Sequence, residues 1–413
     1  MTRTNLTYMK TFKCYPWTLG LLSAGLISLP TVTQAEEKPS SVLTALSSTT
    51  LSGYVDTSAQ WNMGTGNANL PNYAFGGPGK ADGFNLNVVK LSIEKPVEAA
   101  DAWGAGYKVD LLAGPDANAF ATQSSGVAAD FGVKQAYVAL HAPVGNGLDM
   151  KLGVWDTIIG YEVFESINNP NVTRSYGYTV EPTTHTGFLA SYQFNDMLSA
   201  SAGIANTFGP TINGRPFLGG GTTVPPGGQG PKAESYKAYM GSVTFTAPTN
   251  WGVLGGSTIT GCIINGFNSG SPDTGAAADQ TSFYIGGTFN TPVTGLKAGI
   301  SYDYAGVSKQ PLTGDTSAYA NVIGLYASYQ LTEKLSIYGR GEYAWSGRPV
   351  FLATSVFEAT ATLQYDLWKN VLSRLEFRWD HAADASGPYG GTVVGAGHLD
   401  NSYMLLADFA YKF

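Results

Sequence analysis

The connections between alternating segments are the feature of this sequence that most restricts its fold. Between residues 52 and 413, sixteen segments alternate apolar and polar residues with the period of two expected of a β-strand that faces two different surroundings. The connections between these segments are alternately long and short, and every long one exceeds every short one. The predicted strands are 52–63, 85–95, 102–114, 132–142, 148–155, 184–194, 198–208, 236–247, 254–267, 281–290, 296–305, 319–331, 335–346, 355–367, 371–382 and 401–413.

Alternating loop lengths are typical of an outer-membrane barrel, which has an even number of strands, short periplasmic turns and long external loops. Hydrocarbon cannot satisfy an unpaired backbone N–H or C=O, so a sheet that spans a membrane has to close on itself. We therefore predict an all-β fold, a single closed antiparallel transmembrane β-barrel over residues 52–413 with sixteen strands. Fourteen and eighteen strands stay open as alternatives, because strand ends are placed only to within about two to four residues.

The composition agrees with a barrel rather than with a helical membrane protein. Charged residues make up 13% of the chain, against about 25% in soluble domains. After residue 35, no apolar run approaches the roughly 18 residues that a membrane-spanning helix needs. Aromatic residues near strand ends fit the girdles that barrels place at the two membrane interfaces; they are Trp61, Trp103, Trp155, Tyr329, Trp345 and Trp368.

The N-terminal segment 1–35 has the pattern of a cleaved secretory signal peptide. Three basic residues precede an apolar stretch at 17–29, and the small residues Thr33 and Ala35 precede the predicted cleavage site. A short N-terminal anchor helix is the alternative. Residues 36–51 form a polar lead-in to the barrel. Together with the barrel pattern, the signal peptide predicts export to the outer membrane of a Gram-negative bacterium.

Charge and residue spacing argue against nucleic-acid binding and against enzymatic chemistry. Removal of segment 1–35 leaves 20 basic and 30 acidic residues, a balance that disfavours nucleic acid as a partner. One cysteine, Cys262, then remains, and the four histidines stand in separate segments, so we expect no disulfide, metal site or other cofactor. The glycine-rich stretch at 219–228 lacks the Lys-Ser/Thr of a phosphate loop, and we predict a flexible external loop there. We expect no enzyme.

The last three alternating aromatic residues, Phe409, Tyr411 and Phe413, resemble the C-terminal signal by which the barrel assembly machinery recognises outer-membrane proteins. We therefore expect this machinery and outer-membrane lipid as partners.

Several short motifs resemble one family. Segment 133–187 and the opening of the first strand are similar to the OmpL-like β-barrel porin family of Gram-negative bacteria. The motifs are Ser52-Gly53-Tyr54-Val55-Asp56, Gln135-Ala136-Tyr137-Val138, Pro143-Val144-Gly145-Asn146-Gly147, Gly160-Tyr161-Glu162 with Glu165-Ser166, Asn171 with Arg174-Ser175, and Pro182 with His185-Thr186-Gly187. The resemblance implies an outer-membrane barrel that passes small hydrophilic solutes. A homotrimer is what porins of sixteen strands lead us to expect.

The predicted third external loop, at about 156–183, is the longest connection and the main candidate for a site. In general porins the corresponding loop bends into the lumen. We expect its carboxylates Glu162 and Glu165 to face inner-wall arginines and to narrow the pore. The alternative is that the loop carboxylates sit on the exposed rim while the arginines pair locally with Glu342, Glu376 and Asp380. The pore-constriction candidates are Asp156, Glu162, Glu165, Arg174, Glu181, Arg340, Glu342, Arg374, Glu376 and Arg378.

Charged residues at inward positions of the last strands predict a water-filled lumen, because an unpaired charge in a dry interior is very costly. The leading function is a porin for passive diffusion of small hydrophilic solutes and ions. One alternative is a substrate-selective channel, for example for sugars, with a stacking path made by Tyr161, Phe164, Tyr176 and Tyr178. The other is a structural or adhesive barrel with a closed lumen.

Overall fold

The structure is a computed structural model, and it describes residues 48–413 except 65, 77–79, 81, 98–101, 125–128, 218–234, 270–276, 309–316 and 349. The predicted signal peptide, residues 36–47 of the predicted lead-in and the glycine-rich stretch at 219–228 lie outside the described residues. The last two residues of the predicted lead-in belong to the first strand, which begins at Thr50.

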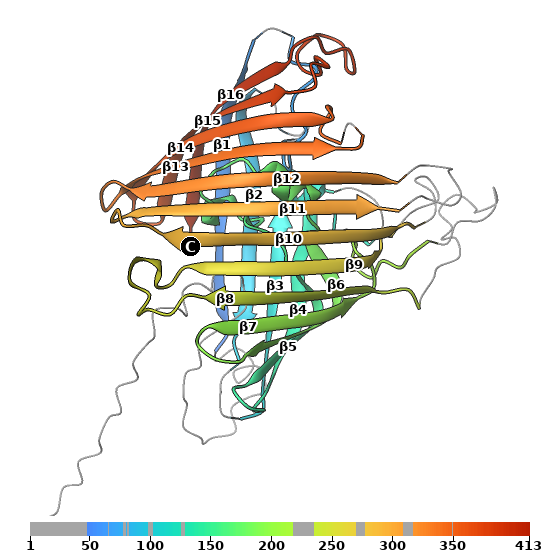
Figure 1. Cartoon of the computed structure of the whole chain (residues 1–413), viewed down its shortest axis with the longest axis vertical. Coiled ribbons are helices and arrows are strands. Elements are labelled where there is room, and N and C mark those ends of the chain that lie inside the picture. The colour runs from blue at the N-terminus through green and yellow to red at the C-terminus, as the bar shows by residue number, and fades with distance from the viewer. Residues whose placement is uncertain are drawn as a thin grey trace, which may run out of the picture.

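The described residues form one closed antiparallel barrel of sixteen strands, which confirms the predicted fold class and strand number (Figure 1). Each strand pairs with its neighbours in the sequence, and the last strand pairs with the first. The strands are β1 (Thr50–Met63), β2 (Gly83–Lys95), β3 (Gly104–Ala113), β4 (Phe131–Ala142), β5 (Leu148–Asp156), β6 (Thr184–Gln193), β7 (Leu198–Ala205), β8 (Ala238–Thr246), β9 (Thr258–Phe267), β10 (Asp279–Asn290), β11 (Leu296–Val307), β12 (Ala318–Gln330), β13 (Leu335–Ser346), β14 (Ser355–Trp368), β15 (Val371–Ala382) and β16 (Asn401–Lys412).

Closure of the barrel depends on the β1–β16 pair, which runs in register from Tyr54 opposite Lys412 to Met63 opposite Tyr403. The terminal Phe413 extends this pairing, because it exchanges two backbone hydrogen bonds of 3.0 Å with Gly53. The sheet therefore has no unpaired edge to expose to lipid.

Alternate residues of each strand meet different surroundings. On β15, Leu375 is 49% exposed on the outer face, whereas the neighbouring Glu376 and Arg378 are fully buried on the inner face. The aromatic residues of the predicted C-terminal assembly signal lie on the outer face of β16.

Most of the predicted girdle aromatics are exposed or partly exposed, but the assignment of Trp155 to a girdle is wrong. Trp155 is fully buried, and its ring lies 5.3 Å from the ring of His185. Its position opposite His185 on β6 places it on the inner face, where it joins an apolar cluster.

Long and short connections gather at opposite ends of the barrel, but the predicted rule that every long one exceeds every short one is wrong. The β8–β9 connection, 247–257, is as long as the β9–β10 connection, 268–278, because its residues form the 3₁₀ helix η2 (Gly252–Leu254) in place of a tight turn. The longest connection is 206–237, before β8, and not the predicted one before β6.

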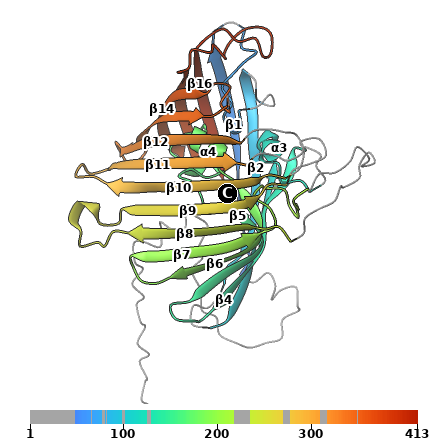
Figure 2. The same cartoon turned by 45° about the vertical axis from the view of Figure 1, so that its right-hand side comes forward.

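The helices of the described residues are few and short: α3 (Pro115–Phe120), α4 (Tyr176–Val180), η1 (Ser166–Asn168) and η2. Among the described residues, no helix has the length and apolar character needed to cross a membrane. Helix α4 and η1 belong to the β5–β6 connection, residues 157–183. Figure 2 shows α4 between the walls of the barrel, and it packs against β11, β12 and β13. We call residues 157–183 the lumen loop.

Candidate functional site

The lumen loop leaves β5 and contacts first β9 and then β12. On β9, the Cys262 thiol donates a hydrogen bond of 2.9 Å to the backbone oxygen of Ile158. On β12, the ring of Tyr326 stacks on that of Tyr161, with centroids 3.9 Å apart and planes 18° apart. The loop therefore crosses the bore of the barrel within its first five residues.

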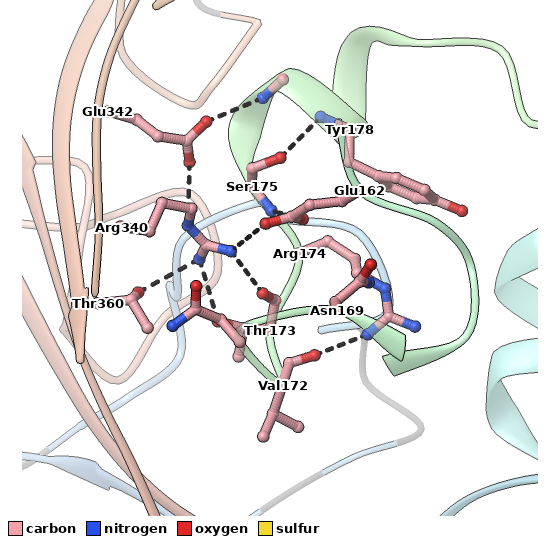
Figure 3. A network of polar contacts seen from close by, with 12 residues as sticks. Glu162, Asn169, Val172, Thr173, Arg174, Ser175, Tyr178, Arg340, Glu342 and Thr360 are labelled. Carbon is pink, nitrogen blue, oxygen red and sulfur yellow. Dashed lines mark hydrogen bonds and ion pairs between the residues drawn. The ribbon is translucent and has the colours of Figure 1, made fainter. Parts of the chain in front are cut away.

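Arg340 on β13 is the centre of the contact between loop and wall (Figure 3). Its guanidinium lies 2.8 Å from the Glu162 carboxylate of the loop and donates a second bond of 2.7 Å to the backbone oxygen of Thr173. The same group lies 3.2 Å from Glu358 on β14 and 3.6 Å from Glu342 on β13. Arg340 thus joins the loop carboxylate to two wall carboxylates. The pairing of loop with wall, Glu162 with Arg340, exists beside the local pairing within the wall, Arg340 with Glu342, that was the alternative.

Two wall carboxylates hold the backbone of the loop. Glu342 accepts hydrogen bonds from the amides of Tyr176, at 2.8 Å, and Gly177, at 3.1 Å. Glu376 on β15 accepts one of 2.9 Å from the amide of Thr173. Hydrogen bonds from backbone N–H groups to ionised carboxylates are about twice as strong as neutral ones. These bonds fix both the start of α4 and the segment before it.

The arginines of β15 combine wall and loop partners. Arg374 lies 2.8 Å from Asp408 on β16 and donates a bond of 2.7 Å to the backbone oxygen of Ser166. Arg378 lies 2.8 Å from Asp380 on its own strand. Neither arginine contacts Glu162 or Glu165 among the ion pairs of the described residues.

Glu165 meets lysines instead of the expected arginines. Its carboxylate lies 2.5 Å from Lys90 on β2 and 3.0 Å from Lys134 on β4. Lys134 also lies 2.5 Å from Asp156, and Lys90 lies 3.0 Å from Asp110. Burial by itself would raise the pKa of Glu165, but the two ammonium groups outweigh burial and hold the pKa well below its ordinary range. We call Lys90, Asp110, Lys134, Asp156 and Glu165 the lysine cluster.

One lysine of this cluster, Lys134, was missed for a local reason. The β3–β4 register shifts so that Asp110 faces Gln135 while Leu111 faces Val133. This bulge lets both Lys134 and Gln135 point inward, whereas strict alternation would send one of them outward. The Lys134 side chain is 1% exposed.

Arg174 does not reach the wall with its guanidinium. It donates to the backbone oxygens of Phe164 and Val172, the second at 2.6 Å, both within the lumen loop. Its guanidinium lies over the ring of Phe75, 5.0 Å from the centroid, and 6.0 Å from that of Tyr178. Arg174 therefore holds the fold of the loop.

The loop aromatics expected to form a stacking path are mostly enclosed. Phe164, Tyr176 and Tyr178 are buried, and the Tyr176 hydroxyl donates a bond of 2.7 Å to Asp380. Tyr161 alone of the four is partly exposed, and one of its ring faces is occupied by Tyr326.

Glu181, where the loop returns to the wall, forms a hydrogen bond with Asp303 on β11. Enclosure by the barrel and then the neighbouring Asp303 raise the pKa of Glu181 well above its ordinary value. No cation is paired with this carboxyl group among the described residues.

The inward charges expected to face lumen water are thus mostly covered by the loop. Hydrogen bonds from loop amides and ion pairs with loop side chains replace the water that sequence reasoning invoked. Between β5 and β10, the inner wall is instead apolar, and residues such as Leu189, Met240 and Ile264 pack against Ile159 of the loop.

Toward the short turns the inner wall is polar and meets water. Glu94 and Lys108 pair at 3.0 Å with both side chains partly exposed, and the Asp149 side chain is 49% exposed. On β6 and β7, the inward hydroxyls of Ser191 and Ser201 are hydrogen-bonded to each other at 2.8 Å. We call this region the vestibule. In the described part of the chain, no three His, Cys, Asp or Glu residues form a group that could hold a metal ion.

Several solved outer-membrane proteins have this fold. The anion-selective porin from Comamonas acidovorans is 13% identical with a TM-score of 0.58, over 89% of this chain and 99% of its own. The outer-membrane channel DcaP of Acinetobacter baumannii is 13% identical with a TM-score of 0.56, over 88% and 97%. The trimer form of OmpT of Vibrio cholerae is 12% identical with a TM-score of 0.54, over 88% and 99%. These likenesses concern the fold.

The family comparison concerns the sequence itself. A search of curated proteins gave no match. The family model described as "Putative beta-barrel porin-2, OmpL-like" matches residues 48–413, which is the whole barrel, and confirms the resemblance noted in the sequence. This chain belongs to that OmpL-like family, and it is an outer-membrane porin of a Gram-negative bacterium.

Proposed function

We propose that small hydrophilic solutes and ions diffuse passively through this barrel and that the lumen loop forms its narrowest part. The observation that carries the proposal is the charged attachment of one loop to opposite walls above a wet vestibule. A loop that only covered the mouth would need no partners on β2, β9, β13 and β15.

The constriction candidates divide into two roles in this proposal. Residues that anchor the loop are Glu162, Arg174, Glu181, Arg340, Glu342, Arg374, Glu376 and Arg378. Asp156 and Glu165 belong to the lysine cluster and act on the passing ion. The Asp156 side chain is 35% exposed, and Glu165 is paired with Lys90, whose side chain is 12% exposed. The cluster holds three carboxylates and two ammonium groups, and this balance favours a weak preference for cations.

Conductance of the purified protein in a planar bilayer tests the proposal. Folding is checked first by migration in gel electrophoresis that resists urea and changes on boiling. Ohmic steps are the expected result, and current blocked by one solute would favour a substrate-selective channel. A folded sample that never conducts would refute transport and leave a structural or adhesive barrel.

We also propose the route by which the chain reaches its membrane. The signal peptide at 1–35 is removed on export, and the outward aromatic face of β16 is read by the barrel assembly machinery. The trimer form of a protein with the same fold supports a homotrimer. Mass spectrometry of the mature N-terminus and cross-linking in native membranes test these two points. We propose no catalytic activity.

A further inference from the structure

Two acidic side chains meet where the lumen loop returns to the wall. Glu181 is the C-cap residue of α4, and Asp303 lies on the inner face of β11, 2% exposed. Their side chains are hydrogen-bonded to each other. Ionised carboxylates only accept hydrogen bonds, so this contact requires that one of the two carry a proton.

Among the described residues, the surroundings of the pair supply acids and neutral groups but no compensating cation. The groups that face the pair from neighbouring elements are Glu162 of the loop, Cys262 on β9, Tyr284 on β10 and Glu342 on β13. Glu162 contacts Arg340 and the Ser175 amide, and Glu342 contacts Arg340 and the Tyr176 amide. The contact between Glu181 and Asp303 is therefore held by a shared proton and not by a cation among the described residues.

Tight packing keeps the two carboxyl groups together. A Cβ atom at Gly177 of α4 would lie 2.7 Å from Asp303 Oδ2, and one at Gly160 would lie 2.5 Å from Glu181 Oε2. A side chain at either position would displace a carboxyl group from the pair, so the two glycines leave room for the contact. Asp303 Oδ1, on the other side, has no hydrogen-bond partner. If both groups ionise, two negative charges face each other with little solvent between them.

We propose that Glu181 and Asp303 are positioning residues for transport: they form a proton-dependent latch that docks the end of the lumen loop on β11 and releases it when both ionise. This inference rests on the proposed porin function, since release of the loop widens the pore. Docking raises the affinity of the pair for its proton. Docking is therefore fully stabilised below the ordinary carboxyl pKa, and this stabilisation is lost as the pH rises through the raised pKa of the docked state.

Modification of the Cys262 thiol to a methyl disulfide reports on the latch without using transport. The Cys262 thiol is buried and donates to Ile158 of the loop, so a thiol reagent reaches it when the loop moves. We would measure the rate with methyl methanethiosulfonate, which is neutral, from about pH 5 upward. Opening of the loop releases one proton from the pair, which raises the reaction rate about tenfold per pH unit. Ionisation of the thiol raises the rate by about another tenfold per pH unit. The expected rise is therefore about a hundredfold per pH unit in the native protein.

Two conservative variants remove the shared proton. In Glu181→Gln and in Asp303→Asn, an amide donates to the remaining carboxyl group, so docking persists and the rise falls to about tenfold per pH unit. Asp366→Asn, at the exposed end of β14, should behave as the native protein. Equal slopes in the native protein and a folded variant would overturn the latch. If neither variant folds, a native slope of only tenfold would do the same.

Conductance of the same samples separates the latch from the porin function. The latch predicts a single-channel conductance that rises with pH in the native protein and stays flat in Glu181→Gln. If the slopes of thiol modification differ but no sample conducts, the porin proposal fails and the latch stands. If all samples conduct alike at every pH and the slopes are equal, the latch fails and the porin proposal stands.

Discussion

Removal of the Arg340 guanidinium should loosen the lumen loop while leaving the barrel closed. In Arg340→Met, Glu162 and Glu358 lose the charge that lies 2.8 Å and 3.2 Å away, and the Thr173 backbone oxygen loses its donor. Loss of one partner from a buried ion pair costs about 3–5 kcal/mol. At about 1.4 kcal/mol per factor of ten, the opening equilibrium of the loop should rise by roughly two to three and a half orders of magnitude.

Hydrogen exchange followed by mass spectrometry measures this change directly. The amides of Thr173, Tyr176 and Gly177 are bonded to wall carboxylates and should exchange faster by that factor, whereas amides of β13 and β14 should not. Lys369→Met, in the exposed β14–β15 turn, removes one positive charge without touching the loop and should leave exchange unchanged. Unchanged exchange in a folded Arg340→Met protein would show that Arg340 does not hold the loop.

Three further changes test other parts of the molecule. Gly53→Ala should impair closure of the barrel, because the added Cβ would lie 2.2 Å from the Lys90 backbone oxygen. The fraction of heat-modifiable protein after refolding should therefore fall, and normal refolding would contradict this. Lys134→Met should raise the pKa of Glu165, because the larger of the two ammonium contributions that lower this pKa is gone. The variant should also prefer cations more strongly at neutral pH, measured as a shift in reversal potential under a salt gradient. A shift toward anions would refute the role given to the lysine cluster. Trp155→Ala should cost about 3–5 kcal/mol in unfolding free energy by guanidinium titration, as a fully buried aromatic side chain does, and a girdle residue would cost less.

The barrel was predictable because its signal is local and repeated. In each strand, residues two apart share one face and one type of surroundings. On β15, Leu375 and Phe377 face outward, whereas Glu376 and Arg378 face inward. Individual strand ends were placed less well: β9 begins at Thr258, four residues after the predicted start, since η2 occupies that segment.

The partners within the lumen were predictable only in part. Inward parity identified Arg340, and its pairing with Glu162 agrees with the expectation. Lys134, one of the two lysine partners of Glu165, was missed because the bulge on β4 changes which residues face inward. No sequence pattern reports a bulge whose cause is the fit between two particular strands.

The sequence by itself determined the closed barrel, because side-chain polarity on each face and the need to pair every backbone group in hydrocarbon act on every strand independently. Only the tertiary structure decided what fills the barrel. The path of the 27-residue lumen loop, the pairing of Glu162 with Arg340 and the meeting of Glu181 with Asp303 depend on contacts between segments more than a hundred residues apart. Such contacts are selected by the balance of desolvation against pairing inside the finished ring, and residue types alone do not specify that balance.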